Sequence, residues 1–520
     1  LRAPVDLLYN GGIGTYVKAT RQSSAEVGDR ANDAIRVNGA ELRCKVVAEG
    51  GNLGFTQLGR VEYAADGGRI FTDAIDNSAG VDCSDHEVNI KIMLGVAMAE
   101  GRMDAAQRNG TLAEMTDDVA RLVLADNYYQ TQSLAVSGVR GEKLLDAQAS
   151  FIRALEKAGR LNRAVEHLPA EDEILERRLA RRGLTAPERA VLLAYSKMAL
   201  YDELLAGALV DDPYVGRALV DYFPPLLREK YAEAMPRHAL RREIVATVVA
   251  NAMINRTGSV FVHRMGEETG ATAEETTRAY ILVRDIFGLD PLWAEIDALD
   301  NKVPAALQYD MLIEVGRLVV RATLWFLRRR RERLPIADVL RIFQPGLKAL
   351  QAMVPGVLSA GDRMAWTSTV AQFAKEGVSR PLAERVASLG ALYATLDITE
   401  VAMEQGKSVE CIAAVYFALV GELELRWFSE KITQLPTETP WQALARNALR
   451  DDLATQQRAL ASAVAKTAES DDPHRMLEAW KERYAPAIGR LKTMTEELKR
   501  AGTLDLAVLS VLLRELRSLA

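Results

Sequence analysis

The segments Glu49-Gly50-Gly51-Asn52-Leu53-Gly54 and Asp76-Asn77-Ser78-Ala79-Gly80-Val81-Asp82-Cys83-Ser84 decide how the first part of this chain folds. Each segment follows a short apolar run typical of a β-strand, Lys45-Val46-Val47-Ala48 and Arg69-Ile70-Phe71-Thr72. Glycine lets a backbone pass close to a ligand, and the neighbouring carboxamides and hydroxyl supply directional hydrogen bonds. The pattern therefore predicts a small-molecule site where sheet strands end.

The first 101 residues alternate β-type runs with turns rich in Gly, Asn and Asp, which indicates an α/β domain. We expect strands at 5–9, 42–48 and 69–73, and a short helix at 29–35. The first strand ends in Asn10-Gly11-Gly12-Ile13-Gly14. Strand, helix and strand make the crossover unit of a parallel sheet, whose ligands lie beyond the carboxyl ends of the strands. All three loops are thus predicted at one edge of the sheet.

Beyond about residue 84 the hydrophobic period becomes helical. Ser84-Asp85-His86-Glu87 fits a capping box, so we expect a helix that begins at Ser84 and ends near Gly101. Thr185-Ala186-Pro187-Glu188 predicts another helix start. Apolar stripes predict a long helix from Leu307 to Trp325 and a last one from Leu506 to Leu516.

The predicted fold is therefore an α/β domain at the N-terminus, followed by a large all-α C-terminal region. We expect it to be predominantly helical. The predicted domains are an α/β domain at 1–101 and helical domains at 102–335 and 336–520.

Composition narrows the class of protein. The 520 residues are 49% hydrophobic and 26% charged, as in ordinary globular proteins, and the net charge of −6 argues against a nucleic-acid partner. Three cysteines make no disulfide framework, which favours a cytoplasmic location. No apolar run reaches about 18 residues, so we expect no membrane partner.

A longer run of motifs carries a family resemblance. Asp6-Leu7-Leu8-Tyr9-Asn10-Gly11-Gly12-Ile13-Gly14-Thr15-Tyr16-Val17-Lys18 leads on to Gly28-Asp29-Arg30-Ala31-Asn32-Asp33 and then to the two segments above. In this order they resemble the large bacterial NAD-dependent glutamate dehydrogenases over roughly residues 4 to 95. The helical remainder is similar to that family's C-terminal region in position and texture. The resemblance implies that residues 1–101 are the C-terminal half of a dinucleotide-binding catalytic domain, a partial Rossmann-like α/β cofactor domain. The resemblance implies oxidation of L-glutamate to 2-oxoglutarate and ammonium with NAD as cofactor, and we expect a homo-oligomer.

The resemblance also implies site residues. Residues of two loops are expected to contact the cofactor: Gly12, Gly14, Gly50, Gly51 and Asn52. Of these, Asn52 is expected to contact the nicotinamide ribose or carboxamide. Asn77 is expected at the substrate, between cofactor and glutamate. Ser84 is expected to hydrogen-bond the side-chain carboxylate of glutamate.

Two expected features are missing from the sequence. No Gly-x-Gly-x-x-Gly fingerprint with a following acidic residue is present, and the family's catalytic lysine and aspartate lie upstream of the matched region. We therefore expect a fragment, without catalytic residues of its own and inactive alone. Two other functions stay open: a non-catalytic helical module for assembly or regulation, and a dehydrogenase of a different amino acid.

Local alternatives stand beside these site predictions. Gly50-Gly51-Asn52 could be a plain turn, and Asn77 could close an Asx turn. Cys83 and His86, with Cys44 elsewhere, give only a weak zinc signal, so no metal is predicted. Four acidic residues in and beside the second segment are expected to be mostly caps and turns: Asp73, Asp76, Asp82 and Asp85. Arg328 to Arg331 is expected to be a solvated helix end.

Overall fold

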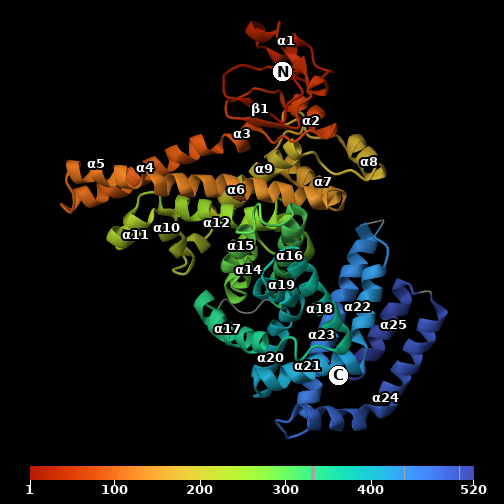
Figure 1. Cartoon of the computed structure of the whole chain (residues 1–520). Helices are drawn as coiled ribbons and strands as arrows, with labels where there is room; N and C mark the ends of the chain where they lie inside the picture. The colour runs from red at the N-terminus through yellow and green to blue at the C-terminus, as the bar shows by residue number, and fades with distance from the viewer. Residues whose placement is uncertain (330–333, 438–439, 503) are drawn as a thin grey trace. The chain divides into compact units, whose positions relative to one another are not determined.

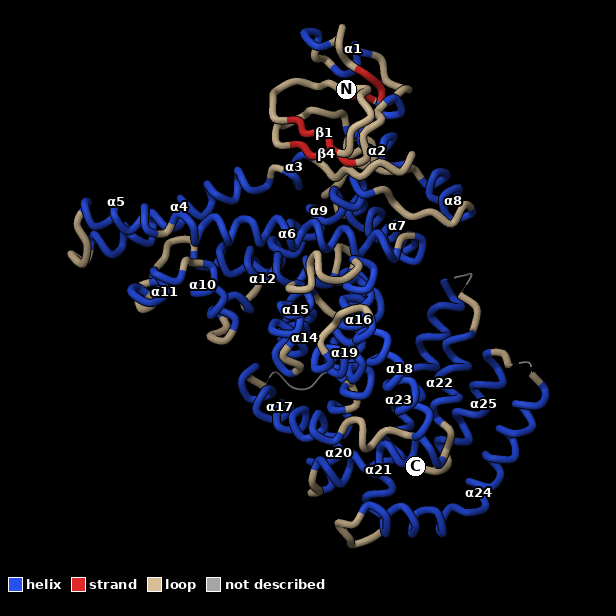
Figure 2. The backbone as a smooth tube through the Cα atoms, viewed as in Figure 1, coloured by secondary structure: helices blue, strands red, loops and turns tan. Residues whose placement is uncertain are grey.

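The computed structural model describes residues 1–329, 334–437, 440–502 and 504–520. The chain divides into two compact units. The first comprises Leu1–Ile281 with Thr323–Arg330, and the second comprises Leu282–Ala322 with Arg331–Ala520. Helices dominate both units, and the described strands all lie within the first fifty residues (Figure 2). The predominantly helical prediction is thus confirmed.

Two short parallel strand pairs open the first unit. β1 (Leu7–Asn10) pairs with β4 (Val46–Glu49), so that Asn10 and Glu49 end side by side. β2 (Val17–Lys18) pairs with β3 (Val37–Asn38). The predicted parallel arrangement of the strands near 5–9 and 42–48 is confirmed, although both are shorter than expected.

Two local predictions were wrong. The expected strand at 69–73 amounts to one parallel bridge between Arg69 and Val46, because the chain turns into α3 (Asp73–Asp76) directly after Thr72. The expected helix at 29–35 is a single 3-10 turn, Arg30–Asn32. Asp29 accepts from the backbone N–H of Thr15 at 2.8 Å, which ties this segment to the loop after β1 instead of extending a helix.

A small apolar core holds the α/β part together. Its buried members come from β2, β3, β4 and α2 (Gln57–Ala65) and from the loops between them: Val17, Val37, Cys44, Val47, Phe55, Tyr63 and Ile70. The Tyr63 hydroxyl donates to the Cys44 carbonyl at 2.9 Å, which satisfies a polar group inside this core. The carboxyl ends of β1 and β4 are thereby fixed next to each other.

A helical layer follows in the same unit. Its helices are α4 (Ser78–Ala99), α5 (Ala105–Glu114), α6 (Thr116–Arg140), α7 (Glu142–Lys157), α8 (Glu171–Leu179), α9 (Ala186–Ala206), α10 (Ala218–Tyr222), α11 (Pro225–Tyr231), α12 (Arg241–Thr257) and α13 (Phe261–Thr269), with α1 (Ser24–Val27) before β3. α4 and α6 lie side by side, and α6 also packs on α9 and α12 (Figure 1). The predicted start at Thr185 is confirmed, since Thr185 and Glu188 form a capping box at the N-terminus of α9.

The predicted helix start at Ser84 was wrong. α4 begins at Ser78, with Asn77 as its N-cap residue, so Ser84 lies in the second turn. A capping serine needs extended backbone, whereas Ser84 is helical and its hydroxyl donates to the Val81 carbonyl at 2.7 Å. The residue types of a capping box are present there, but the helix has already begun six residues earlier.

The remaining helices belong wholly or largely to the second unit, except α14, most of which lies in the first unit. They are α14 (Ala273–Ile286), α15 (Leu289–Asp297), α16 (Ala305–Arg329), α17 (Ile336–Met353), α18 (Ala360–Lys375), α19 (Arg380–Leu392), α20 (Thr395–Gln405), α21 (Val409–Glu422), α22 (Leu425–Gln434), α23 (Pro440–Thr467), α24 (Pro473–Ala501) and α25 (Leu506–Arg517). The long helix predicted from Leu307 and the last helix are confirmed as α16 and α25. Arg328 and Arg329 lie in the last turn of α16, and the other two arginines of that run lie outside the described residues.

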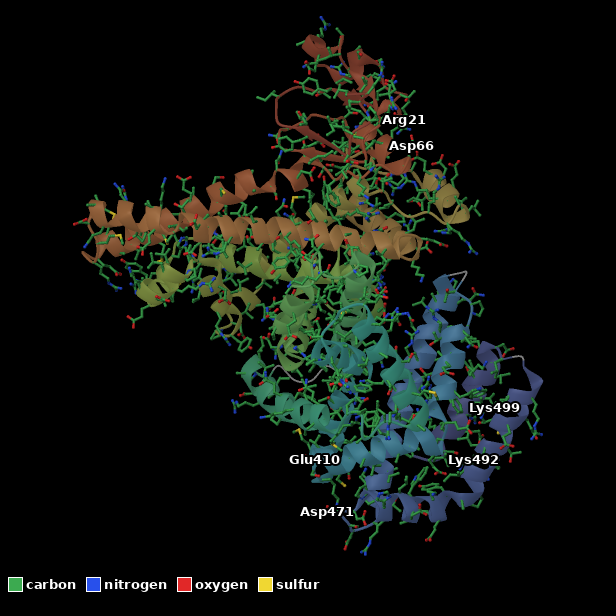
Figure 3. All side chains as sticks on the ribbon, in the orientation of Figure 1. Arg21, Asp66, Glu410, Asp471, Lys492 and Lys499 are labelled. Carbon is green, nitrogen blue, oxygen red and sulfur yellow. The ribbon has the colours of Figure 1, made fainter. Side chains whose placement is uncertain are left out.

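Ion pairs join neighbouring helices inside the second unit. Lys492 on α24 reaches Glu422 at the end of α21 at 2.6 Å, and Lys499 pairs with Glu424 (Figure 3). Among the described residues, no single helix is long and apolar enough to cross a membrane. Two bent pairs meet that length and composition test together: α12 with α13, and α19 with α20.

Candidate functional site

The loops after β1 and β4 pack directly against each other. The backbone N–H groups of Gly50 and Gly51 both donate to the Asn10 carbonyl, at 2.8 and 3.0 Å. A Cβ on Gly51 would meet the Gly12 carbonyl oxygen at 2.4 Å, and one on Gly50 would meet the Tyr9 hydroxyl at 2.1 Å. Glycine is therefore required at Gly51 by the close approach of the two loops, whether or not a ligand is bound, whereas at Gly50 the exposed Tyr9 side chain can move aside.

Asn52 and Asn77, predicted for cofactor and substrate, are brought together. The Asn77 Nδ2 donates to Asn52 Oδ1 at 2.6 Å, although the two residues are 25 positions apart. Asn77 is the N-cap residue of α4, yet its side chain makes no capping hydrogen bond. A carboxamide pair joined by one such bond still has one N–H₂ donor and one oxygen acceptor on its outer ends. The pair can therefore meet a ligand that offers both an acceptor and a donor.

Ser84 lies on the same face of α4 as Asn77. Seven residues are close to two full turns, so the two residues are separated by roughly 10 Å along the helix axis. Ser84 is exposed, and its oxygen can still accept a hydrogen bond while its proton is held by Val81. The structure does not bring Ser84 next to Asn52, and the free N–H groups of the helix N-terminus lie near Ser78 instead.

A cavity of about 640 Å³ opens beside the loop after β1. Its lining combines aromatic and apolar side chains with loop backbone: Leu1, Arg2, Leu8, Tyr9, Asn10, Gly12, Tyr16, Ile35, Val37, Gly54 and Phe55. The Asn10 Nδ2 is buried there without a hydrogen-bond partner among the described residues. An apolar hollow at the carboxyl end of a parallel strand is where a sheet of this kind places its ligands.

Gly12 lines this cavity, whereas Gly14 serves the backbone. Gly14 has a φ of +131°, which a side chain rarely adopts, and a Cβ there would meet Asn32 Nδ2 at 2.6 Å. The tight turn at Gly14 lets Tyr16 donate its hydroxyl to the Ile13 carbonyl at 2.8 Å. Gly14 therefore shapes the loop that presents Gly12.

A buried ion pair, which sequence reasoning missed, fixes the loop after β4. The Glu49 side chain, 0% exposed, accepts from Arg60 Nε at 2.7 Å and Nη2 at 3.0 Å, and Arg60 also reaches Asp73 at 3.2 Å. Burial raises the pKa of Glu49 even though Arg60 acts to lower it. Asp73 also accepts from the Leu53 backbone N–H at 2.8 Å. The network thus ties α2 and α3 to the loop that carries Asn52.

Asp76 and Asp82 titrate close to neutral pH instead of serving only as caps or turns. Burial raises the pKa of Asp76 to about 6, and its carboxylate accepts from the Glu49 backbone N–H at 2.9 Å. Burial, with the charges of Asp126 and Asp85, raises the pKa of Asp82 to about 7. Such groups are typical of functional sites, although structural networks shift pKa values as well.

Lys197 on α9 completes a cluster with Asp82 and Asp126. Burial lowers the pKa of Lys197 to about 8, against the opposing effect of the two carboxylates. Sequence reasoning missed this lysine. Its position in the sequence could have revealed it. Lys197 lies four residues after Leu193 and three before Leu200, so it places a charge on the buried stripe of the helix.

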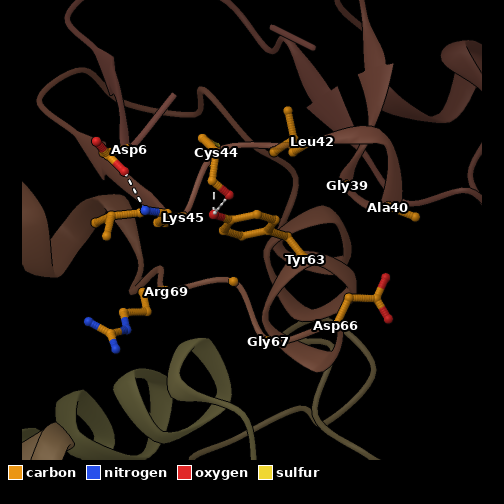
Figure 4. Close-up of a pocket in the computed structure, with 12 residues that line it drawn as sticks. Asp6, Gly39, Ala40, Leu42, Cys44, Lys45, Tyr63, Asp66, Gly67 and Arg69 are labelled. Atoms are coloured by element: carbon orange, nitrogen blue, oxygen red, sulfur yellow. Dashed lines mark hydrogen bonds and ion pairs between the residues drawn. The ribbon is translucent and has the colours of Figure 1, made fainter. Parts of the chain in front are cut away.

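The residues of the weak zinc signal, and a second cavity, give no support for a different functional site. Cys44 is buried and Cys83 is exposed, while His86 is stacked on Tyr222 with ring centroids 4.4 Å apart. A cavity of about 480 Å³ lies at the opposite, amino-terminal end of β4 (Figure 4). There Lys45 pairs with Asp6 at 2.6 Å, and both side chains are largely exposed.

Comparisons with known proteins cover nearly the whole chain. Residues 1–137 match the model of the bacterial NAD-glutamate dehydrogenase catalytic domain, and residues 181–518 match that of the glutamate dehydrogenase C-terminal region. NAD-specific glutamate dehydrogenases of Pseudomonas aeruginosa, Halomonas elongata and Mycobacterium tuberculosis are 45%, 42% and 40% identical to the chain. These alignments cover 100%, 100% and 99% of the chain but 32% of each relative. The chain thus spans about a third of the length of the curated relatives it matches.

Proposed function

The chain belongs to the bacterial NAD-glutamate dehydrogenase family, and from that premise we propose that it forms part of an enzyme that oxidises L-glutamate to 2-oxoglutarate and ammonium. Its first ~100 residues would complete a Rossmann-like cofactor domain and one wall of the glutamate pocket. The catalytic lysine and aspartate that the family resemblance implies would come from the part of the relatives that the chain does not span. The chain alone would then be inactive.

The observation that carries the proposal is the carboxamide pair at the meeting point of two loops. Asn52 follows β4 and Asn77 opens α4, and the 2.6 Å bond between them joins the residue predicted for the nicotinamide end of NAD to the one predicted for glutamate. Substrate and cofactor must lie in contact for a hydride to pass between them. A bonded pair with one member in each role supports that juxtaposition.

NAD, when bound, supplies the hydride acceptor. The residues of this chain would bind and orient. The cavity beside Gly12 would take part of the dinucleotide. Asn52 and Asn77 fix orientation with neutral amides, which add no charge next to a reacting carbon. Ser84, two turns along α4, would turn its hydroxyl from the Val81 carbonyl to donate a hydrogen bond to the far carboxylate of glutamate.

The helical region carries a second part of the proposal. We keep 1–101, 102–335 and 336–520 as functional divisions, with the later two serving assembly or regulation of a homo-oligomer. Buried stripes such as those of α16 and α25 are used inside the fold. Assembly would therefore rest on exposed residues of these helices.

Asn77→Ala in a chain extended to the length of the relatives tests the proposal. We expect kcat/KM for glutamate to fall about 100-fold, since misplacing one reactant by an ångström costs that much. The matched control is Asn109→Ala on α5, whose exposed side chain accepts hydrogen bonds from Arg108. Equal kinetics in both folded variants would contradict the role of Asn77.

A further inference from the structure

Asp82 of α4, Asp126 of α6 and Lys197 of α9, here called the acid–lysine cluster, form a group of charges outside the predicted site residues. One ligand atom each of Asp82, His86 and Asp126 lies within 4.8 Å of the others. A metal ion would need such spacing, but Lys197 already supplies a positive charge to both carboxylates. Lys197 therefore offsets part of the negative charge of the two carboxylates.

Hydrogen bonds lead from this cluster to the start of α4. Lys197 Nζ donates to Gln130 Oε1 at 3.2 Å, and Gln130 Nε2 donates to Ser78 Oγ at 3.4 Å. Asn127 Nδ2 donates to the same Ser78 oxygen at 3.0 Å and to the Ile75 carbonyl at 2.7 Å. Ser78 is the neighbour of Asn77, so these bonds clamp both sides of the residue predicted to meet glutamate.

We propose that the acid–lysine cluster is a proton-sharing positioning group, which sets the orientation of Asn77 through Gln130, Asn127 and Ser78. The inference rests on the proposed function, because it assigns glutamate to this segment. Two adjacent carboxyl groups in a buried place hold one proton between them more easily than two charges. Loss of that proton leaves a second negative charge, which draws Lys197 toward the carboxylates and away from Gln130.

The surroundings of the cluster fit a group that changes charge near neutral pH. Asp82 faces Asp85 and His86 on its own helix, Asp126 on α6, and Lys197 on α9. Tyr222 of α10 donates its hydroxyl to Asp85 at 2.8 Å, which leaves that carboxylate engaged elsewhere. The Asp82 Oδ2 atom is buried without a partner among the described residues, so ionised Asp82 has no donor there.

For stability alone, an apolar residue at position 197 would be more favourable than a lysine. Apolar residues of similar size are often neutral or stabilising where they replace a buried charge group. Leu193 and Leu200 show that this face of α9 otherwise packs apolar side chains. A lysine there therefore fits a positioning role better than a packing role.

The test uses the extended enzyme, with Lys197→Met, Asp82→Asn and the control Glu87→Gln, whose carboxylate is exposed on α4 and pairs with Lys91. Glutamate kinetics are measured from about pH 6 to pH 9 at saturating NAD. We expect an inflection between about pH 7 and pH 8 in the wild type and Glu87→Gln. In Lys197→Met we expect this inflection to be lost. KM for glutamate should rise about 10-fold with kcat nearly unchanged, because the variant removes one charge-assisted hydrogen bond.

Folded variants with the wild-type profile and KM would overturn the inference while leaving the proposed function intact. If the folded wild type is inert with glutamate, the proposed function fails instead. Proton sharing in the cluster is then tested by the melting temperatures of the wild type and Asp82→Asn. Asp82→Asn should gain thermal stability relative to the wild type as pH rises from about 5.5 to about 8.5, because ionised Asp82 destabilises the folded state. A constant difference over that range would refute proton sharing itself.

Discussion

Arg60→Met is expected to destabilise the first unit far more than an exposed arginine variant would. Arg60 has a side chain 6% exposed and gives Glu49 two of its hydrogen bonds, while the Phe55 backbone N–H gives a third at 3.2 Å. Removal leaves a buried carboxylate with one donor. Breaking a buried pair in this way costs about 3–5 kcal/mol. The magnitude should lie in this range because neither partner can reach water.

The same loss should depend on pH. Burial already raises the pKa of Glu49 above its usual value despite Arg60. A raised folded-state pKa favours the folded state in acid, and this advantage disappears as pH rises through that pKa. Without Arg60 the pKa of Glu49 rises further. The variant should therefore be destabilised most in alkaline solution and less in acid, where uptake of a proton removes the buried charge of Glu49.

Hydrogen exchange of peptides covering β4 and Phe55 gives the assay, because it reads local opening in a chain of two units. The control is Arg2→Met, whose exposed pair with Glu41 should contribute nothing measurable. The double variant Glu49→Gln with Arg60→Met should lose less stability than Arg60→Met alone, since no charge is left buried. Protection equal to the Arg2→Met control, or strictly additive losses, would refute this reasoning.

Three further results are expected. Ser84→Ala in the extended enzyme should raise KM for glutamate about 10-fold with little change in kcat; Ser510→Ala, which removes a similar helix-bound hydroxyl, is the control, and an unchanged KM removes Ser84 from the site. Gly51→Ala should weaken NADH binding at least about 10-fold in a fluorescence titration, because its Cβ would push against the Gly12 carbonyl; equal affinity in Gly51→Ala and in the open helical control Gly110→Ala would contradict the packed loops. Asp76→Asn should stabilise the fold relative to the wild type by on the order of 2 kcal/mol above pH 6 and by nothing near pH 4, because the pKa of Asp76 is raised to about 6; a calorimetric difference independent of pH speaks against a buried acid.

Local chemistry made much of this fold predictable. The pair of strands ending at Asn10 and Glu49, the cap at Thr185 and the stripe of α16 all follow from residue types within one turn or strand. The start of α4 did not follow, because Ser84 and Glu87 carry capping chemistry but lie in a helix that already begins at Ser78. A pattern of residue types does not fix which of two nearby starts the chain takes.

The charges near the site depended on tertiary contacts. In the sequence, Glu49 has the position of an exposed acidic residue at the start of a loop. Its burial is explained by the ion pair with Arg60, eleven positions away. Asp82 meets Asp126 and Lys197 from two other helices, which no local pattern connects. The carboxamide pair was predicted member by member, but the bond between Asn52 and Asn77 needed the fold.

Glutamate-dependent formation of NADH tests the central claim most directly. The chain and a version extended to the length of its relatives are compared at equal concentration, with correct folding of both checked by circular dichroism. The account predicts NADH formation by the extended form and none by the chain alone. NADH formation by the chain alone, or a folded extended form that is inert with glutamate, would contradict it.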